Sequence, residues 1–141
     1  MAVADAVTAA PTAAALPLLG LTEPLPGFPG HRDYALVAAD LDGRLHWLQS
    51  VAADGPRFLA VSAAAFFPDY APVLPRAVRA ELELDGSASP QLYCLLTVPA
   101  GDPAAATANL RAPLVVNAGR GLARQVVLTD GSHPIRRPLR R

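Results

Sequence analysis

The chain of 141 residues contains no lysine, and it has a single cysteine, a single methionine and a single tryptophan. One cysteine, Cys94, cannot form an internal disulfide, which fits a reducing compartment such as the cytoplasm. No apolar stretch approaches the ~20 residues that cross a bilayer as a helix, so we expect no membrane segment. Its 12 basic residues are all arginine and are balanced by 12 acidic residues. The chain therefore has no net charge to attract nucleic acid from a distance.

Residue patterns for catalysis or metal binding are also scarce. The three histidines, His31, His46 and His133, lie far apart and lack the spacing of metal ligands. No glycine-rich phosphate loop follows a predicted strand. Cys94 lies within an apolar stretch and is expected to be buried, whereas a catalytic thiol would need a neighbouring base that the sequence does not identify. We expect no enzyme activity, no cofactor and no metal.

The sequence is rich in the turn-forming residues proline and glycine. The 15 prolines and 10 glycines divide the chain into short segments, which favours strands over a helical bundle. Residues 34–37 and 45–50 flank Asp42-Gly43, a strong hairpin pattern, and Asp40 is expected to bond the backbone of the same turn. Further strands are expected at residues 58–62, 91–98, 114–116 and 123–129. The strand at 91–98 is apolar on both faces and should be central. This spacing predicts an all-β sandwich or small barrel.

Three segments need separate interpretation. Residues 76–84 alternate apolar and polar side chains like a strand, but Pro75 and the helix-forming composition favour a helix. The alanine-rich residues 1–15 lack the basic start of a secretion signal and are expected to form a flexible arm. The arginine-rich C-terminus is either a solvated tail or a contact for an acidic partner or RNA. Its basic residues are Arg136, Arg137, Arg140 and Arg141.

Several short strings occur in an order and spacing that resemble one family. They are Leu25-Pro26-Gly27-Phe28, Trp47-Leu48-Gln49-Ser50, Phe66-Phe67-Pro68-Asp69-Tyr70, Thr107-Ala108-Asn109-Leu110 with Ala112-Pro113 and Asn117, Gln125-Val126-Val127-Leu128, and Arg136-Arg137-Pro138-Leu139. Together they resemble the flagellar assembly factor FliW family over about residues 21–139. Each string is weak evidence alone, and their shared order carries the resemblance.

The resemblance implies a mainly β domain over residues 16–139, folded as a small, partly open antiparallel β-barrel with one short helix at about 76–82. Residues 1–15 would form the arm and 140–141 the end of a basic tail. The first strand of the family is hard to find, and only residues 16–21 could supply it. We therefore expect an open barrel edge that a partner or a second copy covers, in a monomer or weak dimer.

The resemblance also implies a non-enzymatic function. Family members bind two proteins in turn, the RNA-binding translational repressor CsrA and the filament subunit flagellin. This chain would bind CsrA away from its RNA surface and antagonise repression of flagellin synthesis, with flagellin as the competing partner. The alternative is a flagellin-binding chaperone without a regulatory role. Neither interpretation involves direct contact with nucleic acid or a membrane.

Five residues are candidates for partner binding. Phe67, Asp69 and Tyr70 lie in a loop that we expect to be exposed, and aromatic side chains anchor many interfaces. Thr107 and Asn109 lie where a loop enters a strand, where their side chains either satisfy backbone groups or contact a partner.

Three other residues carry structural expectations. Trp47 is predicted to lie in the core or to cover one end of the barrel. Gln49 and Gln125 are predicted to pair across the barrel.

Overall fold

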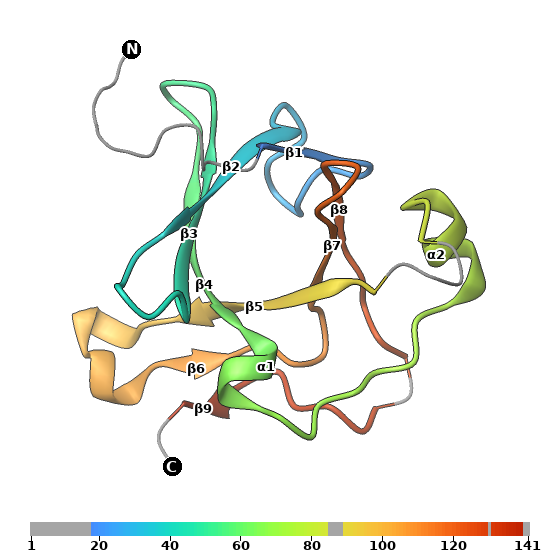
Figure 1. The fold of residues 1–141 in the computed structure, drawn as a ribbon. Helices are drawn as coiled ribbons and strands as arrows, with labels where there is room; N and C mark the ends of the chain where they lie inside the picture. Colours follow the sequence, from blue (N-terminus) through green and yellow to red (C-terminus); the bar gives the residue numbers. More distant parts are fainter. Residues whose placement is uncertain (1–17, 85–88, 130, 140–141) are drawn as a thin grey trace.

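The computed structural model describes residues 18–84, 89–129 and 131–139. Nine strands dominate it (Figure 1). They are β1 Leu18–Leu21, β2 Asp33–Ala38, β3 Leu45–Ser50, β4 Arg57–Ser62, β5 Gln91–Thr97, β6 Thr107–Ala108, β7 Leu114–Asn117, β8 Leu122–Gln125 and β9 Arg137–Pro138. Two short α-helices are α1 Ala63–Phe66 and α2 Arg76–Glu81, and two 3-10 turns are η2 Pro99–Gly101 and η3 Pro103–Ala105. The predicted arm at 1–15 and the tail at 140–141 lie outside the described residues.

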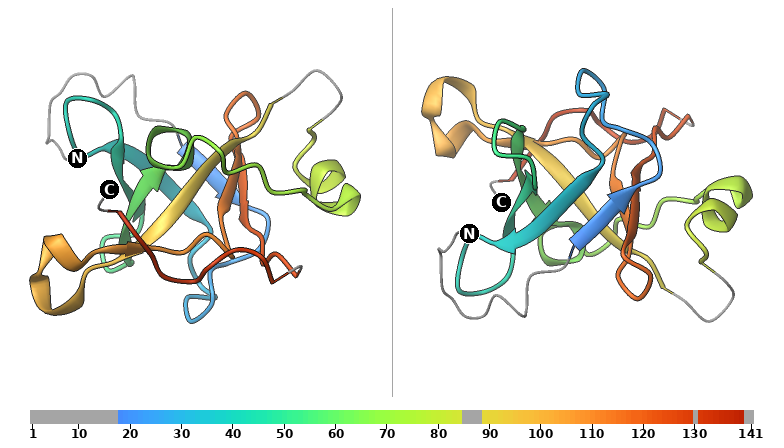
Figure 2. Two further views of the ribbon diagram at one scale, coloured as in Figure 1. Left: turned by 90° about the horizontal axis from the view of Figure 1, so that it is seen from below. Right: turned by 90° about the horizontal axis from the view of Figure 1, so that it is seen from above.

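The sheet closes on itself into a barrel. Its strands follow the order β4-β3-β2-β1-β8-β7-β5, and β4 pairs with β5 to complete the ring. Figure 1 shows these strands surrounding a common interior, and the two views turned by 90° show the strands of opposite walls crossing one another (Figure 2). The all-β class and the barrel are confirmed, but the expected open edge is wrong. The four-residue β1 suffices to close it, because it pairs antiparallel with β2 and parallel with β8.

The β2–β3 hairpin follows its predicted turn chemistry. Gly43 adopts a φ of 71°, a conformation that glycine tolerates without strain. The Asp40 carboxylate accepts hydrogen bonds from the backbone N–H of Arg44 at 3.0 Å and of Leu45 at 3.2 Å. Desolvation alone would raise the pKa of Asp40, but these bonds and the charge of Arg44 lower it. Asp40 is thus a turn residue, as predicted.

Strand alternation divides the apolar side chains between the interior and the outer surface of the barrel. The interior contains Leu19, Tyr34, Leu36, Leu48, Ala60, Leu114 and Val116, among others. A second group, here called the outer cluster, consists of Val61, Ala63, Phe67, Cys94, Ala108 and Leu110. Figure 1 shows α1 and the loop after it lying over β5. The strand at 91–97 is therefore apolar on both faces because both faces are covered, and its predicted central position is confirmed.

The ambiguous segment after Pro75 forms a helix, as the resemblance implied. Helix α2 buries Val78, and Leu82 and Leu84 follow it into a third apolar cluster with Val115 and Val126. The helix ends in a Schellman motif: the Glu83 N–H bonds the carbonyl of Ala80, and the Leu84 N–H bonds that of Arg79. No strand of the described sheet pairs with residues 76–84. The intrinsic helix preference of these residues therefore prevails over the strand pattern.

The last predicted strand is too long. Strand β8 ends at Gln125, and residues 126–129 leave the sheet although they stay attached to it. The N–H of Val126 bonds the carbonyl of Pro113 at 2.9 Å, and that of Leu128 bonds the carbonyl of Arg111 at 2.7 Å. Apolar composition predicted a strand here, but Val126 and Leu128 instead pack against α2 and its C-terminal turn.

Two expectations for the barrel wall are corrected. Trp47 is only half-buried and lies on the outer face, with the Arg57 guanidinium 4.3 Å from its ring centroid. The glutamines do not pair: Gln49 is exposed, and the Gln125 side chain donates to the carbonyl of Ala112 at 3.1 Å. In both cases the strand alternation sets the direction of the side chain, and the sequence does not show which face is inside.

Candidate functional site

The loop after α1 begins with a tight turn that presents Asp69. The N–H of Tyr70 bonds the carbonyl of Phe67 at 2.9 Å, which leaves Pro68 and Asp69 exposed at the tip. Phe67, however, is only 7% exposed and Tyr70 is half-buried. The predicted exposed aromatic loop is therefore wrong for Phe67, because this ring packs into the outer cluster against Ala108 and Leu110.

Phe67 is also covered by the C-terminal segment. The Arg137 guanidinium lies 5.2 Å from the centroid of the Phe67 ring, a cation–π contact. Arg137 belongs to β9, which pairs with β6 at Ala108. Arg136 and Arg137 are both exposed, so Arg137 makes this ring contact while remaining in solvent. No local pattern in the sequence predicts that this arginine covers an aromatic ring.

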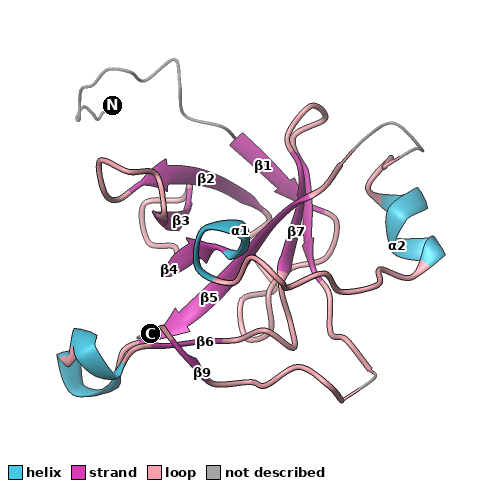
Figure 3. Cartoon of the chain, turned by 60° about the horizontal axis from the view of Figure 1, so that its bottom comes forward, coloured by secondary structure: helices cyan, strands magenta, loops and turns pink. Residues whose placement is uncertain are grey.

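Tyr70 connects its own loop to two other segments, one through its hydroxyl and one through its ring. Its hydroxyl donates to the carbonyl of Leu110 at 2.5 Å, and its ring meets the His133 ring edge-on at 5.1 Å. Residues 67–70, 107–112 and 133–139, far apart in the sequence, thus lie side by side along β5 (Figure 3). The structure brings the two predicted groups of site residues together.

Asn109 and Thr107 hold the middle segment in place. The Asn109 carbonyl oxygen Oδ1 accepts from the N–H of Arg111 at 3.0 Å and of Ala112 at 3.1 Å. Of the two predicted roles, Asn109 performs the backbone-satisfying one. Thr107 is half-buried in β6, between Thr97 of β5 and Pro138 of β9. Asn109 therefore fixes the backbone of this segment, and Thr107 lies within the paired strands beside it.

A cleft of about 370 Å³ opens between α1 and the start of β5. Pro68 and Tyr70 line one side, and Pro90, Leu92 and Tyr93 line the other. None of the residues that line it is charged. Among the predicted site residues Tyr70 lines this cleft, with the exposed Asp69 adjacent to it in the chain. The arrangement offers apolar and aromatic contacts beside one carboxylate, which suits a protein partner.

Comparison with known proteins agrees with this architecture. The family model described as FliW protein matches residues 7–139. The chain belongs to the FliW family.

Individual FliW relatives and one FliW structure show the extent of the match. A flagellar assembly factor FliW of Bdellovibrio bacteriovorus is 35% identical over 122 residues, which is 86% of this chain and 69% of the relative. One of Bacillus licheniformis is 34% identical over 116 residues, 82% of this chain and 80% of the relative. A crystal structure of the flagellar assembly factor FliW superposes with a TM-score of 0.77 at 28% identity, covering 87% of this chain and 85% of that one. The family resemblance predicted from the short strings is confirmed.

The cysteine and one of the histidines of this FliW chain lie in surroundings typical of structural residues. Cys94 is buried in the outer cluster, and burial raises the pKa of its thiol to about 12. The His31 ring bonds the Ser50 hydroxyl at 3.1 Å. Within residues 18–84, 89–129 and 131–139, no three His, Cys, Asp or Glu side chains are grouped to hold a metal ion. In the same ranges, no helix is long and apolar enough to cross a membrane.

Proposed function

We propose that this chain is a cytoplasmic flagellar assembly factor that binds a CsrA-type RNA-binding repressor and antagonises its repression of flagellin synthesis. Flagellin is the competing partner. Membership of the FliW family over residues 7–139 is the observation that carries the proposal. The relatives in Bdellovibrio bacteriovorus and Bacillus licheniformis are both named flagellar assembly factors.

The proposed mechanism is two linked binding equilibria that share one component. The free chain binds CsrA away from its RNA surface and lowers its affinity for RNA, so that flagellin is translated. Unsecreted flagellin then occupies the chain and releases CsrA, which represses again. Because each partner lowers the free concentration of the shared chain, the switch depends on relative concentrations and affinities rather than on covalent chemistry.

The surface proposed for partner binding lies around Asp69 and Tyr70. Asp69 supplies an exposed carboxylate, and Tyr70 forms a wall of the cleft beside α1. Phe67, Thr107 and Asn109 contribute by holding this surface in shape from the outer cluster and the β6 segment. Since the chain has no net charge, recognition rests on local contacts rather than on a global field.

Isothermal titration of the purified chain with purified CsrA tests the proposal, together with the anisotropy of a labelled RNA carrying the flagellin leader. We expect binding at micromolar concentration or tighter and displacement of the RNA. Adding flagellin should restore RNA occupancy. If the chain binds flagellin but not CsrA, the regulatory function is ruled out and the alternative, a flagellin-binding chaperone, is favoured.

Variants locate the surface. Asp69→Ala and Tyr70→Ala should each weaken partner binding by about tenfold or more. Asp54→Ala removes another exposed carboxylate, from the turn between β3 and β4, and serves as the matched control. Equal affinities for the Asp69 and Asp54 variants would place the binding surface elsewhere on the barrel.

A further inference from the structure

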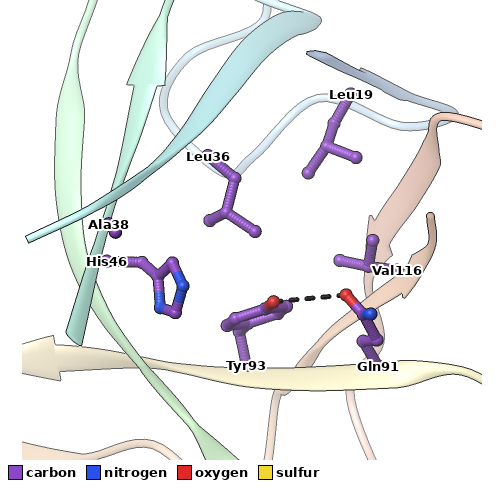
Figure 4. Close-up of a pocket in the computed structure, with 7 residues that line it drawn as sticks. All are labelled: Leu19, Leu36, Ala38, His46, Gln91, Tyr93 and Val116. Atoms are coloured by element: carbon purple, nitrogen blue, oxygen red, sulfur yellow. Dashed lines mark hydrogen bonds between the residues drawn. The ribbon is translucent and has the colours of Figure 1, made fainter. Parts of the chain in front are cut away.

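A pocket of about 190 Å³ opens at one end of the barrel interior. Its lining residues come from β1, β2, β3, β5 and β7 (Figure 4). Leu19, Leu36 and Val116 are buried and form its inner wall, whereas Ala38 and Gln91 are exposed at its mouth. Mouths of β-barrels are frequent sites for small ligands, because the closed sheet holds the lining side chains in fixed positions.

Polar groups converge on this apolar space. The His46 ring points into the pocket and meets the Tyr93 ring edge-on at 5.1 Å. Its Nδ1 atom is buried and has no hydrogen-bond partner in the described part of the chain. The Tyr93 hydroxyl donates to the Gln91 amide oxygen at 3.2 Å, so the Gln91 amide nitrogen is the group left to donate at the mouth. A buried ring nitrogen without a partner is costly and is uncommon in folded proteins, so this one needs an explanation.

The pocket is also uncharged. None of its lining residues is acidic or an arginine. Burial lowers the pKa of His46, although the charge of Asp40 opposes this, so the ring is mostly neutral near pH 7. A charged ligand would lose its hydration here without gaining a counter-charge, which disfavours it strongly. A neutral ligand avoids this cost.

The volume of the pocket limits the size of the ligand. An apolar protein cavity of about 150 Å³ is large enough to hold benzene. We propose that the pocket at the barrel end binds a small neutral aromatic molecule with one hydroxyl or N–H group. The ring packs against Leu36 and Val116, and the polar group bonds His46 or Gln91. The pocket shares Gln91 and Tyr93 with the cleft beside α1, whereas Leu19, Leu36 and Val116 line the pocket alone.

Titration of the full chain with three probes, followed by NMR of labelled Leu and Val methyl groups, tests the proposal. Phenol should bind saturably with a dissociation constant of about 1 mM or below. Benzene lacks the hydrogen bond and should bind about tenfold more weakly. Benzoate carries a charge and should show no saturable binding. Nuclear Overhauser contacts from phenol to the Leu36 and Val116 methyl groups should locate the ring without any variant.

A pair of variants separates this site from others. Ala38→Leu fills the mouth from an exposed position and should weaken phenol binding at least about tenfold. Ala65→Leu makes the same change on exposed α1, outside the pocket, and should leave binding unchanged. Absence of saturable phenol binding, equal binding by the Ala38→Leu variant, or benzoate binding as tight as phenol would each overturn the proposal. Because the readout needs no protein partner, its failure would leave the proposed regulatory function standing.

Discussion

The side-chain amide of Asn117 donates to the carbonyl of Leu82 at 2.8 Å, and it also reaches the carbonyl of Glu83 at 3.2 Å. Asn117 lies at the end of β7 and is only 7% exposed. Leu82 and Glu83 are the residues that directly follow α2, where backbone carbonyls lack partners within the helix. This one side chain therefore fixes the end of the peripheral helix to the barrel wall.

Asn117→Ala should lower the free energy of unfolding by about 1–3 kcal/mol, because two carbonyls lose a buried donor. Urea denaturation measures the change. Arg120→Ala is the control from the same hairpin, since the ion pair of Arg120 with Glu83 is exposed and should be worth less than about 1 kcal/mol. Equal losses from the two variants would mean that Asn117 does not anchor the helix.

Glu83→Gly should leave stability unchanged or raise it by up to about 1 kcal/mol. Glu83 adopts a φ of 57° at the position of the Schellman motif where glycine is usual, and a side chain there is strained. Glu83→Ala removes the same exposed ion pair with Arg120 but keeps a side chain at the positive φ. The difference in stability between the two variants therefore measures the backbone strain alone. Thermal unfolding of the two variants should place the glycine variant above the alanine variant; the reverse order contradicts the strain.

Much of the fold followed from local patterns in the sequence. The Asp42-Gly43 turn, the strands at β2, β3 and β4 and the central β5 could be predicted because turn chemistry and strand alternation act over a few residues. The closure by β1 could not, because a four-residue strand is stabilised by its two neighbours rather than by its own composition. The same reason explains the early end of β8.

The candidate site was only partly predictable. The short strings indicated Phe67, Tyr70 and Asn109 as special. The exposure of Phe67 and Tyr70, however, depends on Arg137 and Leu110, which are distant in the chain. Arg137 covers Phe67 through the β6–β9 pairing, a long-range contact without a local pattern. The barrel-end pocket was missed because five strands must close before its lining residues meet.

Tyr34→Phe should leave the protein as stable or more stable, by up to about 1 kcal/mol. The Tyr34 side chain is fully buried, and its hydroxyl has no hydrogen-bond partner in the described ranges. Removing an unsatisfied buried hydroxyl relieves its desolvation cost. Tyr93→Phe is the contrasting variant because it removes the bond to Gln91. A clear loss of stability in Tyr34→Phe, measured by urea denaturation, would show that the hydroxyl is satisfied.

The stability of the protein should fall at acid pH partly through His46. Burial lowers the pKa of His46 in the folded state, against the opposing charge of Asp40, whereas the unfolded chain keeps a value near 6.5. The folded state therefore binds a proton less readily, and the contribution of the neutral ring is full above pH 6.5 and is lost as the pH falls below it. His46→Leu should flatten the stability profile below about pH 6.5. An unchanged slope would contradict a depressed pKa.

Cys94 should react with thiol reagents only when the protein opens. Its side chain is 0% exposed, and burial raises the pKa of the thiol to about 12, so the reactive thiolate is scarce at neutral pH. Labelling with Ellman's reagent should be at least about 1000-fold slower in the folded chain than in urea, because the opening equilibrium limits it. Asn117 and Cys94 belong to different parts of the barrel. Asn117→Ala should therefore speed the labelling only if Cys94 is exposed by unfolding of the whole protein rather than by a local opening. Rapid labelling of the native chain would place Cys94 at the surface and contradict the packing of the outer cluster.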